Sequence, residues 1–277
     1  DFGETSQKFN IGKGSIATPG NLMGLMEIQR KYGKLDISDV LQNAIYIANH
    51  GVKITSYQGY IISLIKPILE YDTSTNNLYL KNNKLIKEGD IFKNTAFGDF
   101  LSLLAKKGHN YFYNGNGLNP ILKCLDNKSN LTKNDFLNYK TYKRKAKSIN
   151  FKNHIVYTNT TPSHGGPLII FLLKLLKESK IKINNDSLIY AMNITSKARE
   201  TTCINPELEN EINNIFDDEN FKEYLNEFKE NNSKFSKPID GFGSTTHVSV
   251  LDKQGNAASI TTTNGEGCGH TIPEYGI

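Results

Sequence analysis

Two neighbouring hydroxyl residues, Thr245 and Thr246, stand near the end of the chain in the sequence GFGSTTHVSVLDKQGNAASITTT. They follow directly on Gly241-Phe-Gly-Ser244, whose glycines permit backbone conformations that other residues avoid. A threonine hydroxyl is a potential nucleophile, but threonine also begins many ordinary strands. The pair by itself therefore fits either the start of a strand or a nucleophile beside a yielding backbone.

Two other motifs suggest chemistry less strongly. Cys268-Gly-His270 is a candidate metal or thiol pair, but Cys124, Cys203 and Cys268 are widely spaced and contain no zinc-type CxxC pair. Gly12-Lys-Gly-Ser15 lacks the first glycine of a phosphate-binding loop. We favour a backbone turn for both motifs.

Composition excludes several classes of partner. The 277 residues carry a net charge of +5, and lysines alternate with acidic residues along the whole chain. A nucleic-acid-binding surface needs clustered basic charge, so no nucleic-acid partner is expected. The most apolar stretch, Pro167–Leu176, is shorter than a membrane span, so no membrane partner is expected either. The length suits one large domain or two small ones.

The first half of the chain has mainly helical periodicity. Asp36 or Ser38 should cap the second helix, and Thr132 should begin a short capped one. A hairpin is expected around Asn82-Asn83, and the stretch GHNYFYNG at 108–115 reads as a loop. The expected helices cover 19–34, 38–50, 57–69, 94–107, 118–125 and 133–139.

The second half adds strands. NHIVYTNTTP at 153–162 predicts a strand entering a turn. SHGGPLIIFLLKLLKESK at 163–180 predicts a Gly-Gly turn followed by a strongly apolar helix, and further helices are expected over 187–199 and in patches of 205–228. Alternating residues predict a final hairpin that pairs 246–251 with 257–263 across Asp252-Lys-Gln-Gly-Asn256. Helices in a row followed by strands favour an α+β layered domain.

At this point a family resemblance becomes visible. Residues 245–263 resemble the start of the small subunit of γ-glutamyltranspeptidases, which are N-terminal-nucleophile hydrolases. DFGETSQ at 1–7 is similar to that family's Asp-Phe-Arg-Glu-Thr segment, and TPSHGGPLIIFLLKLLKE at 161–178 resembles its Pro-Ser-Ser-Gly-Gly helix. Further collinear matches at 16–55, 85–115 and 131–140 extend the resemblance nearly from end to end.

The resemblance implies a fold and a division of the chain. The fold would be α+β, a four-layer αββα sandwich of the N-terminal-nucleophile hydrolase type. Residues 1–244 would be a helix-rich large-subunit segment and 245–277 the start of the small subunit, both from one precursor and together one structural domain. By comparison with the family, we expect the sequence to be truncated at both ends.

The resemblance also assigns catalytic roles. Thr245 would cut the Ser244–Thr245 bond and so become an N-terminus. Its freed α-amine, with a typical pKa of about 8, would be the general base, so nucleophile and base would share one residue. Thr263 on the partner strand would hydrogen-bond the nucleophile, and Asn264 and Glu4 would contact substrate.

Three further residues complete these expectations. By strand alternation Thr246 should face away from Thr245, and His247 is expected to be structural. Gly3 stands where the family has an arginine that holds the substrate α-carboxylate, and glycine cannot replace that charged contact. Either another cation, with Lys13 as a candidate, takes over this contact, or the substrate differs.

The leading hypothesis is a self-cleaving transferase or hydrolase of γ-glutamyl amides such as glutathione, with water or an amino acid as acceptor. The alternatives are a self-processing amidase of different specificity and a non-catalytic relative with a binding role. No cofactor and no metal are expected, because the nucleophile carries its own base. The cellular location is left open.

Overall fold

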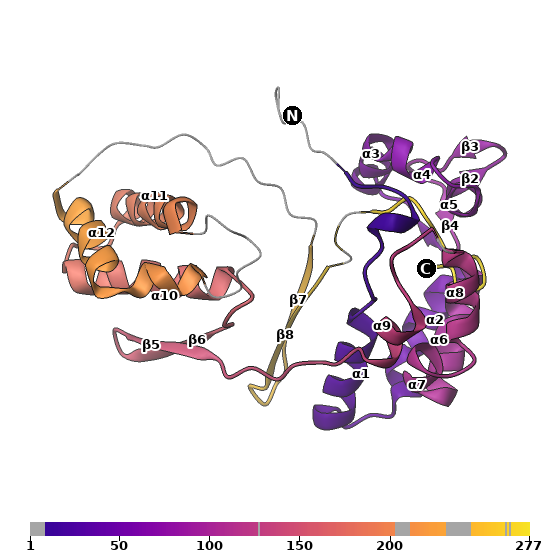
Figure 1. The fold of residues 1–277 in the computed structure, drawn as a ribbon, viewed down its shortest axis with the longest axis horizontal. Coiled ribbons are helices and arrows are strands. Elements are labelled where there is room, and N and C mark those ends of the chain that lie inside the picture. Colours follow the sequence, from indigo (N-terminus) through magenta and orange to yellow (C-terminus); the bar gives the residue numbers. More distant parts are fainter. Residues whose placement is uncertain (1–8, 127, 203–210, 231–244, 264, 266) are drawn as a thin grey trace. The chain divides into compact units, whose positions relative to one another are not determined.

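A computed structural model describes residues 9–126, 128–202, 211–230, 245–263, 265 and 267–277. Helices and short antiparallel strand pairs alternate along these residues (Figure 1). The chain forms two compact units, one from Asp1–Thr141 with Phe242–Ile277 and the other from Tyr142–Gly241. These two units are defined by how closely their residues pack. The boundary expected between residues 244 and 245 is instead the bond that the protein is predicted to cut, so the two divisions answer different questions. The large- and small-subunit division, and its single structural domain, therefore stay predictions.

The larger core of the first unit is helical. Phe100, Leu104, Phe112, Ile121 and Phe136 are each 5% exposed or less and form its centre. They come from helices whose apolar residues recur every three to four positions, so one stripe of each helix faces inward. The five residues lie on α6 (Thr95–Lys107), α7 (Asn110–Tyr113), α8 (Leu118–Leu125) and α9 (Lys133–Leu137). Partly buried side chains of α1 (Asn21–Tyr32) and α2 (Ile37–His50) pack against them.

The last residues of the chain belong to this same core. The Tyr275 ring lies 4.4 Å from that of Phe100, and its hydroxyl donates a 2.7 Å hydrogen bond to the Gly117 carbonyl. Asn94 caps α6 and also donates from its amide to the Gly276 carbonyl at 2.8 Å. The segment that follows the final hairpin is thereby anchored to α6 and to the start of α8.

A smaller cluster in the first unit contains Ile54, Ile62, Leu69 and Ile86. It lies among short elements: β1 (Val52–Lys53), α3 (Ser56–Leu64), α4 (Lys66–Leu69), α5 (Thr73–Tyr79), β2 (Leu80–Lys81), β3 (Lys84–Leu85) and β4 (Ile91–Phe92). The first unit also contains the short 3-10 helix η1 (Lys13–Ser15). The two strand pairs are β1 with β4 and β2 with β3.

The predicted helix over 57–69 and the predicted hairpin can both be compared with this structure. The helix is interrupted at Ile65, because Pro67 at the second position of α4 has no N–H to continue the α3 ladder. The hairpin around Asn82-Asn83 is confirmed. Both asparagines have positive φ, at 53° and 58°, which a two-residue hairpin turn requires.

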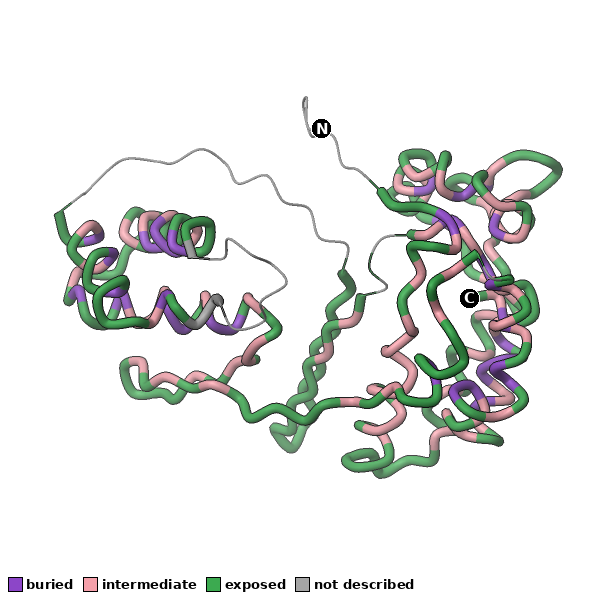
Figure 2. Tube along the Cα trace, viewed as in Figure 1, coloured by how far each residue is buried: buried purple, intermediate pink, exposed green. Residues whose placement is uncertain are grey.

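The second unit has its own core of Phe171, Leu175, Ala191, Ala198 and Phe228, all at most 1% exposed. In Figure 2 the buried residues of this unit lie mainly on its helices. Its elements are β5 (Lys147–Phe151), β6 (His154–Thr158), α10 (Gly165–Ser179), α11 (Asn185–Thr202), η2 (Glu211–Phe216) and α12 (Asp218–Glu230). β5 pairs with β6, and this two-stranded sheet contacts α10.

Removal of the Phe171 ring is expected to destabilise the second unit. The ring is fully buried and packs edge-on against Phe216, Phe221 and Tyr224. Phe171→Ala should lower the free energy of unfolding by about 3–5 kcal/mol, measured by urea denaturation. Ile169→Ala on the same helix is the control, because Ile169 is 50% exposed and should cost less than about 1 kcal/mol. Equal losses in the two variants would contradict this packing.

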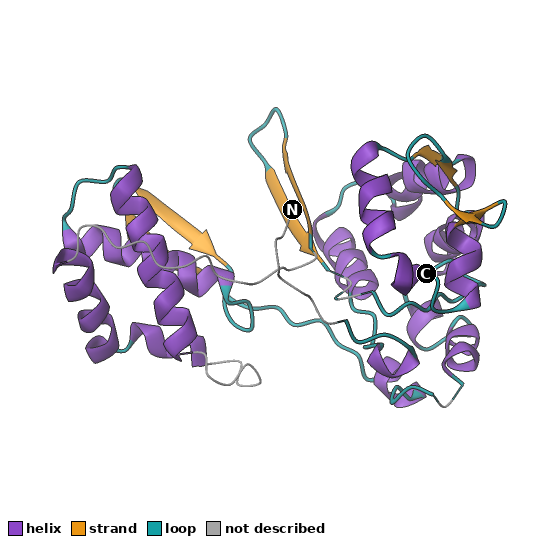
Figure 3. Cartoon of the chain, turned by 90° about the horizontal axis from the view of Figure 1, so that it is seen from above, coloured by secondary structure: helices purple, strands orange, loops and turns teal. Residues whose placement is uncertain are grey.

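The predicted final hairpin is confirmed. β7 (Thr246–Leu251) pairs with β8 (Ala257–Thr262) as an antiparallel hairpin (Figure 3). In its register Thr246 lies opposite Thr262. Asp252 accepts backbone hydrogen bonds from Gln254 and Asn256 at 2.9 and 2.8 Å, and Gly255 has a φ of 84°. These contacts place the turn where its residue types predict it.

Several other local elements differ from the sequence-based expectations. The expected loop at 108–115 contains helix α7, because Phe112 and Tyr113 are drawn into the core. Helix α5 and strands β1, β4 and β5 were not predicted at all. No described helix has the length and apolar character needed to cross a bilayer.

Candidate functional site

Thr245 immediately precedes β7 and is exposed. The preceding residues, including Gly241, Gly243 and Ser244, lie outside the described residues, and so does the bond predicted to be cut. The predicted substrate contacts Glu4 and Asn264, and the divergent Gly3, also lie outside them. The described part of the predicted site is thus Thr245, Thr263 and the hairpin that carries them.

The hairpin register relates the two threonines. Thr246 pairs with Thr262, so one further step of the antiparallel ladder sets Thr245 opposite Thr263. Side chains directly opposite each other have Cβ atoms about 4.5–5.5 Å apart, within reach of a hydrogen bond between short hydroxyl side chains. The register therefore fits a hydroxyl pair at the open end of the hairpin.

Thr263 is fixed by hydrogen bonds to both its backbone carbonyl and its side-chain hydroxyl. Its carbonyl oxygen accepts a 3.0 Å hydrogen bond from the Asn21 amide at the start of α1. Its own hydroxyl oxygen accepts the Gly265 N–H at 3.1 Å. The open end of the hairpin is thereby tied to the first helix of the first unit.

His247 shares a hairpin face with Thr245, because residues two apart on a strand point the same way. Its Nδ1 lies 2.7 Å from the Thr261 hydroxyl, and its Nε2 lies 2.9 Å from the Ser249 hydroxyl. Both ring nitrogens are therefore engaged within the hairpin, in agreement with a structural role. Thr246 takes the opposite face together with Val248.

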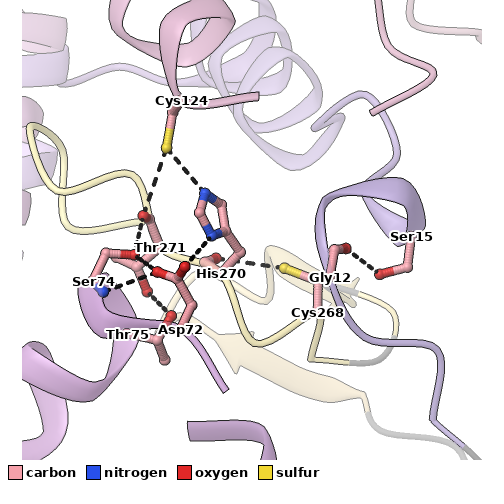
Figure 4. Close-up of polar contacts among 9 residues, drawn as sticks. All are labelled: Gly12, Ser15, Asp72, Ser74, Thr75, Cys124, Cys268, His270 and Thr271. Atoms are coloured by element: carbon pink, nitrogen blue, oxygen red, sulfur yellow. Dashed lines mark hydrogen bonds and ion pairs between the residues drawn. The ribbon is translucent and has the colours of Figure 1, made fainter. Parts of the chain in front are cut away.

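A second cluster of reactive residue types lies in the first unit (Figure 4). The Cys124 Sγ on α8 lies 3.1 Å from His270 Nε2, and His270 Nδ1 lies 3.3 Å from the Asp72 Oδ2. Asp72 caps α5 and accepts the Ser74 N–H at 2.9 Å. Burial alone would raise the pKa of the Asp72 carboxyl, but the Ser74 hydrogen bonds and the His270 ring outweigh it, so its pKa is lowered.

This cluster changes the interpretation of Cys268-Gly-His270. His270 contacts the thiol of Cys124, 146 residues earlier, while the Cys268 thiol donates to the His270 backbone oxygen at 3.4 Å. No sequence spacing links Cys124 or Asp72 to His270, so the cluster could not be found from motifs. Among the described residues, no group of three His, Cys, Asp or Glu side chains is arranged to hold a metal ion.

Lys13, considered above as a replacement for the missing arginine, lies in η1. Its positive charge acts on Cys124, where it lowers the thiol pKa against the larger, raising effect of burial. A role for Lys13 toward the substrate stays a prediction.

Comparison with known proteins places the chain among characterised relatives. The family model for gamma-glutamyltranspeptidase matches residues 2–277. A glutathione hydrolase proenzyme 2 from Schizosaccharomyces pombe is 29% identical over 290 residues, covering 95% of this chain and 46% of the relative. The chain spans about half the length of the curated relatives it matches.

Solved structures show the shared fold. A cephalosporin acylase from Bacillus halodurans matches 99% of this chain and 53% of its own, with a TM-score of 0.76 and 19% identity. A gamma-glutamyltranspeptidase from Helicobacter pylori matches 79% of this chain and 65% of its own, with a TM-score of 0.68 and 20% identity. These likenesses confirm the predicted α+β fold class, the four-layer N-terminal-nucleophile hydrolase type.

Proposed function

The chain belongs to the gamma-glutamyltranspeptidase family, and from this membership we propose that the complete protein cuts itself and then cleaves γ-glutamyl amides through an acyl-enzyme on Thr245. The observation that carries the proposal is the position of Thr245 at the head of β7, opposite Thr263 by register. Names of similar proteins support it, since several are glutathione hydrolase proenzymes.

Self-cleavage would begin with the Thr245 hydroxyl. Its oxygen attacks the Ser244 carbonyl carbon, the peptide nitrogen leaves as the Thr245 α-amine, and water hydrolyses the resulting ester. The products are a large subunit ending at Ser244 and a small subunit beginning at Thr245. Proenzyme names among the relatives agree with such a precursor.

Amide cleavage would then use the same residue twice. The free α-amine accepts the proton of the Thr245 hydroxyl, whose oxygen attacks the γ-carbonyl carbon of the substrate. The amine of the substrate leaves with that proton, and an ester remains on Thr245. Water or an amino acid then releases the acyl group, so the proposal requires no cofactor.

The register gives Thr263 a defined part in this scheme. A hydroxyl opposite Thr245 can donate a hydrogen bond to the attacking oxygen and keep it oriented toward the carbonyl. Asn264 and Glu4 remain the proposed substrate contacts. Gly3, in place of an arginine, specifically favours a second candidate, an amidase whose substrate lacks the usual α-carboxylate contact.

The test compares anilides on the complete purified protein. We expect γ-glutamyl p-nitroanilide to release nitroaniline, while the α-linked glutamyl anilide, which has the same atoms in a different linkage, is left intact. Cleavage of the α-linked or of a non-glutamyl anilide alone would support the second candidate. No release from any anilide by a processed protein would contradict both.

A further inference from the structure

We propose that Cys124 is a nucleophilic thiol activated by His270, and that it is a modification site for low-molecular-weight disulfides. The proposal stands on the contact chain Cys124–His270–Asp72, which brings together α8, the segment after the final hairpin and the start of α5 (Figure 4). It does not depend on Thr245.

The hydrogen-bond chain determines the histidine tautomer. The ionised Asp72 carboxylate only accepts hydrogen bonds, so in the neutral form of His270 the proton lies on Nδ1, 3.3 Å from the Asp72 Oδ2. Nε2 then presents a lone pair to the Cys124 Sγ, 3.1 Å away. A thiol that donates to a neutral imidazole, itself oriented by a carboxylate, has the arrangement of a nucleophile with its general base.

The His270 ring is held in place. Its side chain is only 6% exposed. The next residue, Thr271, accepts from the Ser74 hydroxyl through its carbonyl at 2.8 Å, and its own hydroxyl lies 2.8 Å from that of Thr75. Because the ring is already ordered, little conformational entropy is lost when it takes up the geometry for proton transfer. A cysteine–histidine pair on a mobile surface segment would lose more.

Burial and the charges around Cys124 explain why its thiol needs a neighbouring base to become a thiolate. Burial raises the pKa of its thiol; Lys13 lowers it, and Glu274 and Asp72 raise it further, with a net upward direction. The thiol is accordingly protonated at neutral pH, and a thiolate forms only when a neighbour accepts the proton. His270 Nε2 is positioned to be that acceptor.

The reaction is a thiol–disulfide exchange. The Cys124 proton passes to His270 Nε2, and the Sγ attacks one sulfur of the disulfide. The S–S bond breaks, a mixed disulfide forms on Cys124, and the leaving thiolate takes the proton from His270. No external oxidant or reductant is needed, because one disulfide is exchanged for another.

Cys268 provides a natural comparison within the same chain. Both Cys124 and Cys268 are free and half-buried, so exposure does not separate them. Each thiol contacts a backbone carbonyl, Cys124 that of Thr271 at 3.8 Å and Cys268 that of His270 at 3.4 Å, and a carbonyl cannot accept the thiol proton as a base. The imidazole of His270 beside Cys124 is the contact that separates them. A metal ion does not explain the cluster, since Cys124 and Asp72 contact opposite nitrogens of the ring.

The experiment uses the complete protein in two forms, in which every cysteine except Cys124, or every cysteine except Cys268, is replaced with serine. The probe is a nitrobenzoate disulfide that releases a coloured thiolate on exchange. We expect Cys124 to react with the probe at least about tenfold faster than Cys268. We expect His270→Gln to lower the reaction rate of Cys124 by about 10²-fold. The same substitution should change the rate of Cys268 less than about threefold.

A second variant tests whether the effect of His270→Gln comes from misfolding. Asp72→Asn keeps a good cap for α5 but removes the charge that orients His270, so it should slow Cys124 several-fold. Unchanged rates for Cys124 in both variants would overturn the proposal, because His270 would then be only a packing partner. A faster reaction in His270→Gln would also overturn it, because the ring would then be shielding the thiol.

Discussion

Replacing Thr245 with alanine is expected to leave the complete protein as one uncut chain and to abolish cleavage of γ-glutamyl anilides. Alanine has no oxygen to attack the Ser244 carbonyl, so neither the free α-amine nor the acyl-enzyme forms. Loss of a nucleophile costs about 10⁶-fold in kcat in a comparable hydrolase, so a fall of at least about 10⁴-fold is expected. Intact-mass spectrometry and the anilide assay measure the two effects.

Thr246→Ala is the matched control for this experiment. Thr246 is the next residue, carries the same hydroxyl and takes the opposite face of the hairpin, in register with Thr262. This variant should still be cut into two chains, the smaller beginning at Thr245. A cut at the same bond in Thr245→Ala, or an uncut Thr246→Ala, would show that the nucleophile has been assigned to the wrong residue.

The elements predicted correctly from sequence are those decided by local residue types. The final hairpin was recognised because strand alternation on both sides and a turn with Gly255 agree within one short segment. Helices α2 and α8 followed from apolar periodicity, with Gly51 as the stop signal of the first. In each case a dozen or so residues contain the whole signal.

Helix α7 was missed because its local signal points the other way. Gly108, Asn114 and Gly115 are typical loop residues, yet Phe112 and Tyr113 are almost fully buried. Burial of two aromatic rings contributes more free energy than the weak propensities of the flanking residues. That burial depends on helices elsewhere in the chain, which periodicity over a short window does not reveal.

The Cys124–His270–Asp72 cluster was missed for a related reason. Its members come from three separate segments, and the Cys124–His270 contact spans 146 residues of chain. Only the packing of α8, α5 and the chain end brings them together. The threonine pair was predicted from the family resemblance, and both residues, Thr245 and Thr263, belong to one hairpin whose register is set by its turn. Sequence reasoning therefore suggested a candidate site within one local element, which stays a prediction, and could not suggest a cluster that tertiary contacts bring together.

Thr263→Val is expected to lower kcat by about 10–10²-fold and to slow self-cleavage of the complete protein. Valine keeps the β-branched shape and the backbone carbonyl that accepts from Asn21, but it removes the hydroxyl opposite Thr245. A hydrogen bond to a group that gains charge is worth about 1.5–3 kcal/mol, which corresponds to this loss of rate. KM should change little, because the interaction strengthens only as the hydroxyl oxygen attacks.

Two further variants separate this role from strand stability. Thr263→Ser restores the hydroxyl and should recover most of the rate, whereas Thr262→Val changes the neighbouring residue on the opposite face and should leave kcat within about threefold. Loss of the Gly265 contact alone is not expected to matter, since Thr263 is exposed and water can replace that acceptor.

If Thr263→Val kept the full rate, the position of Thr263 opposite Thr245 would have no role in catalysis. If Thr262→Val lost as much activity as Thr263→Val, damage to the strand would account for both losses. A loss confined to Thr263→Val and reversed by serine would identify the Thr263 hydroxyl as the partner of the nucleophile.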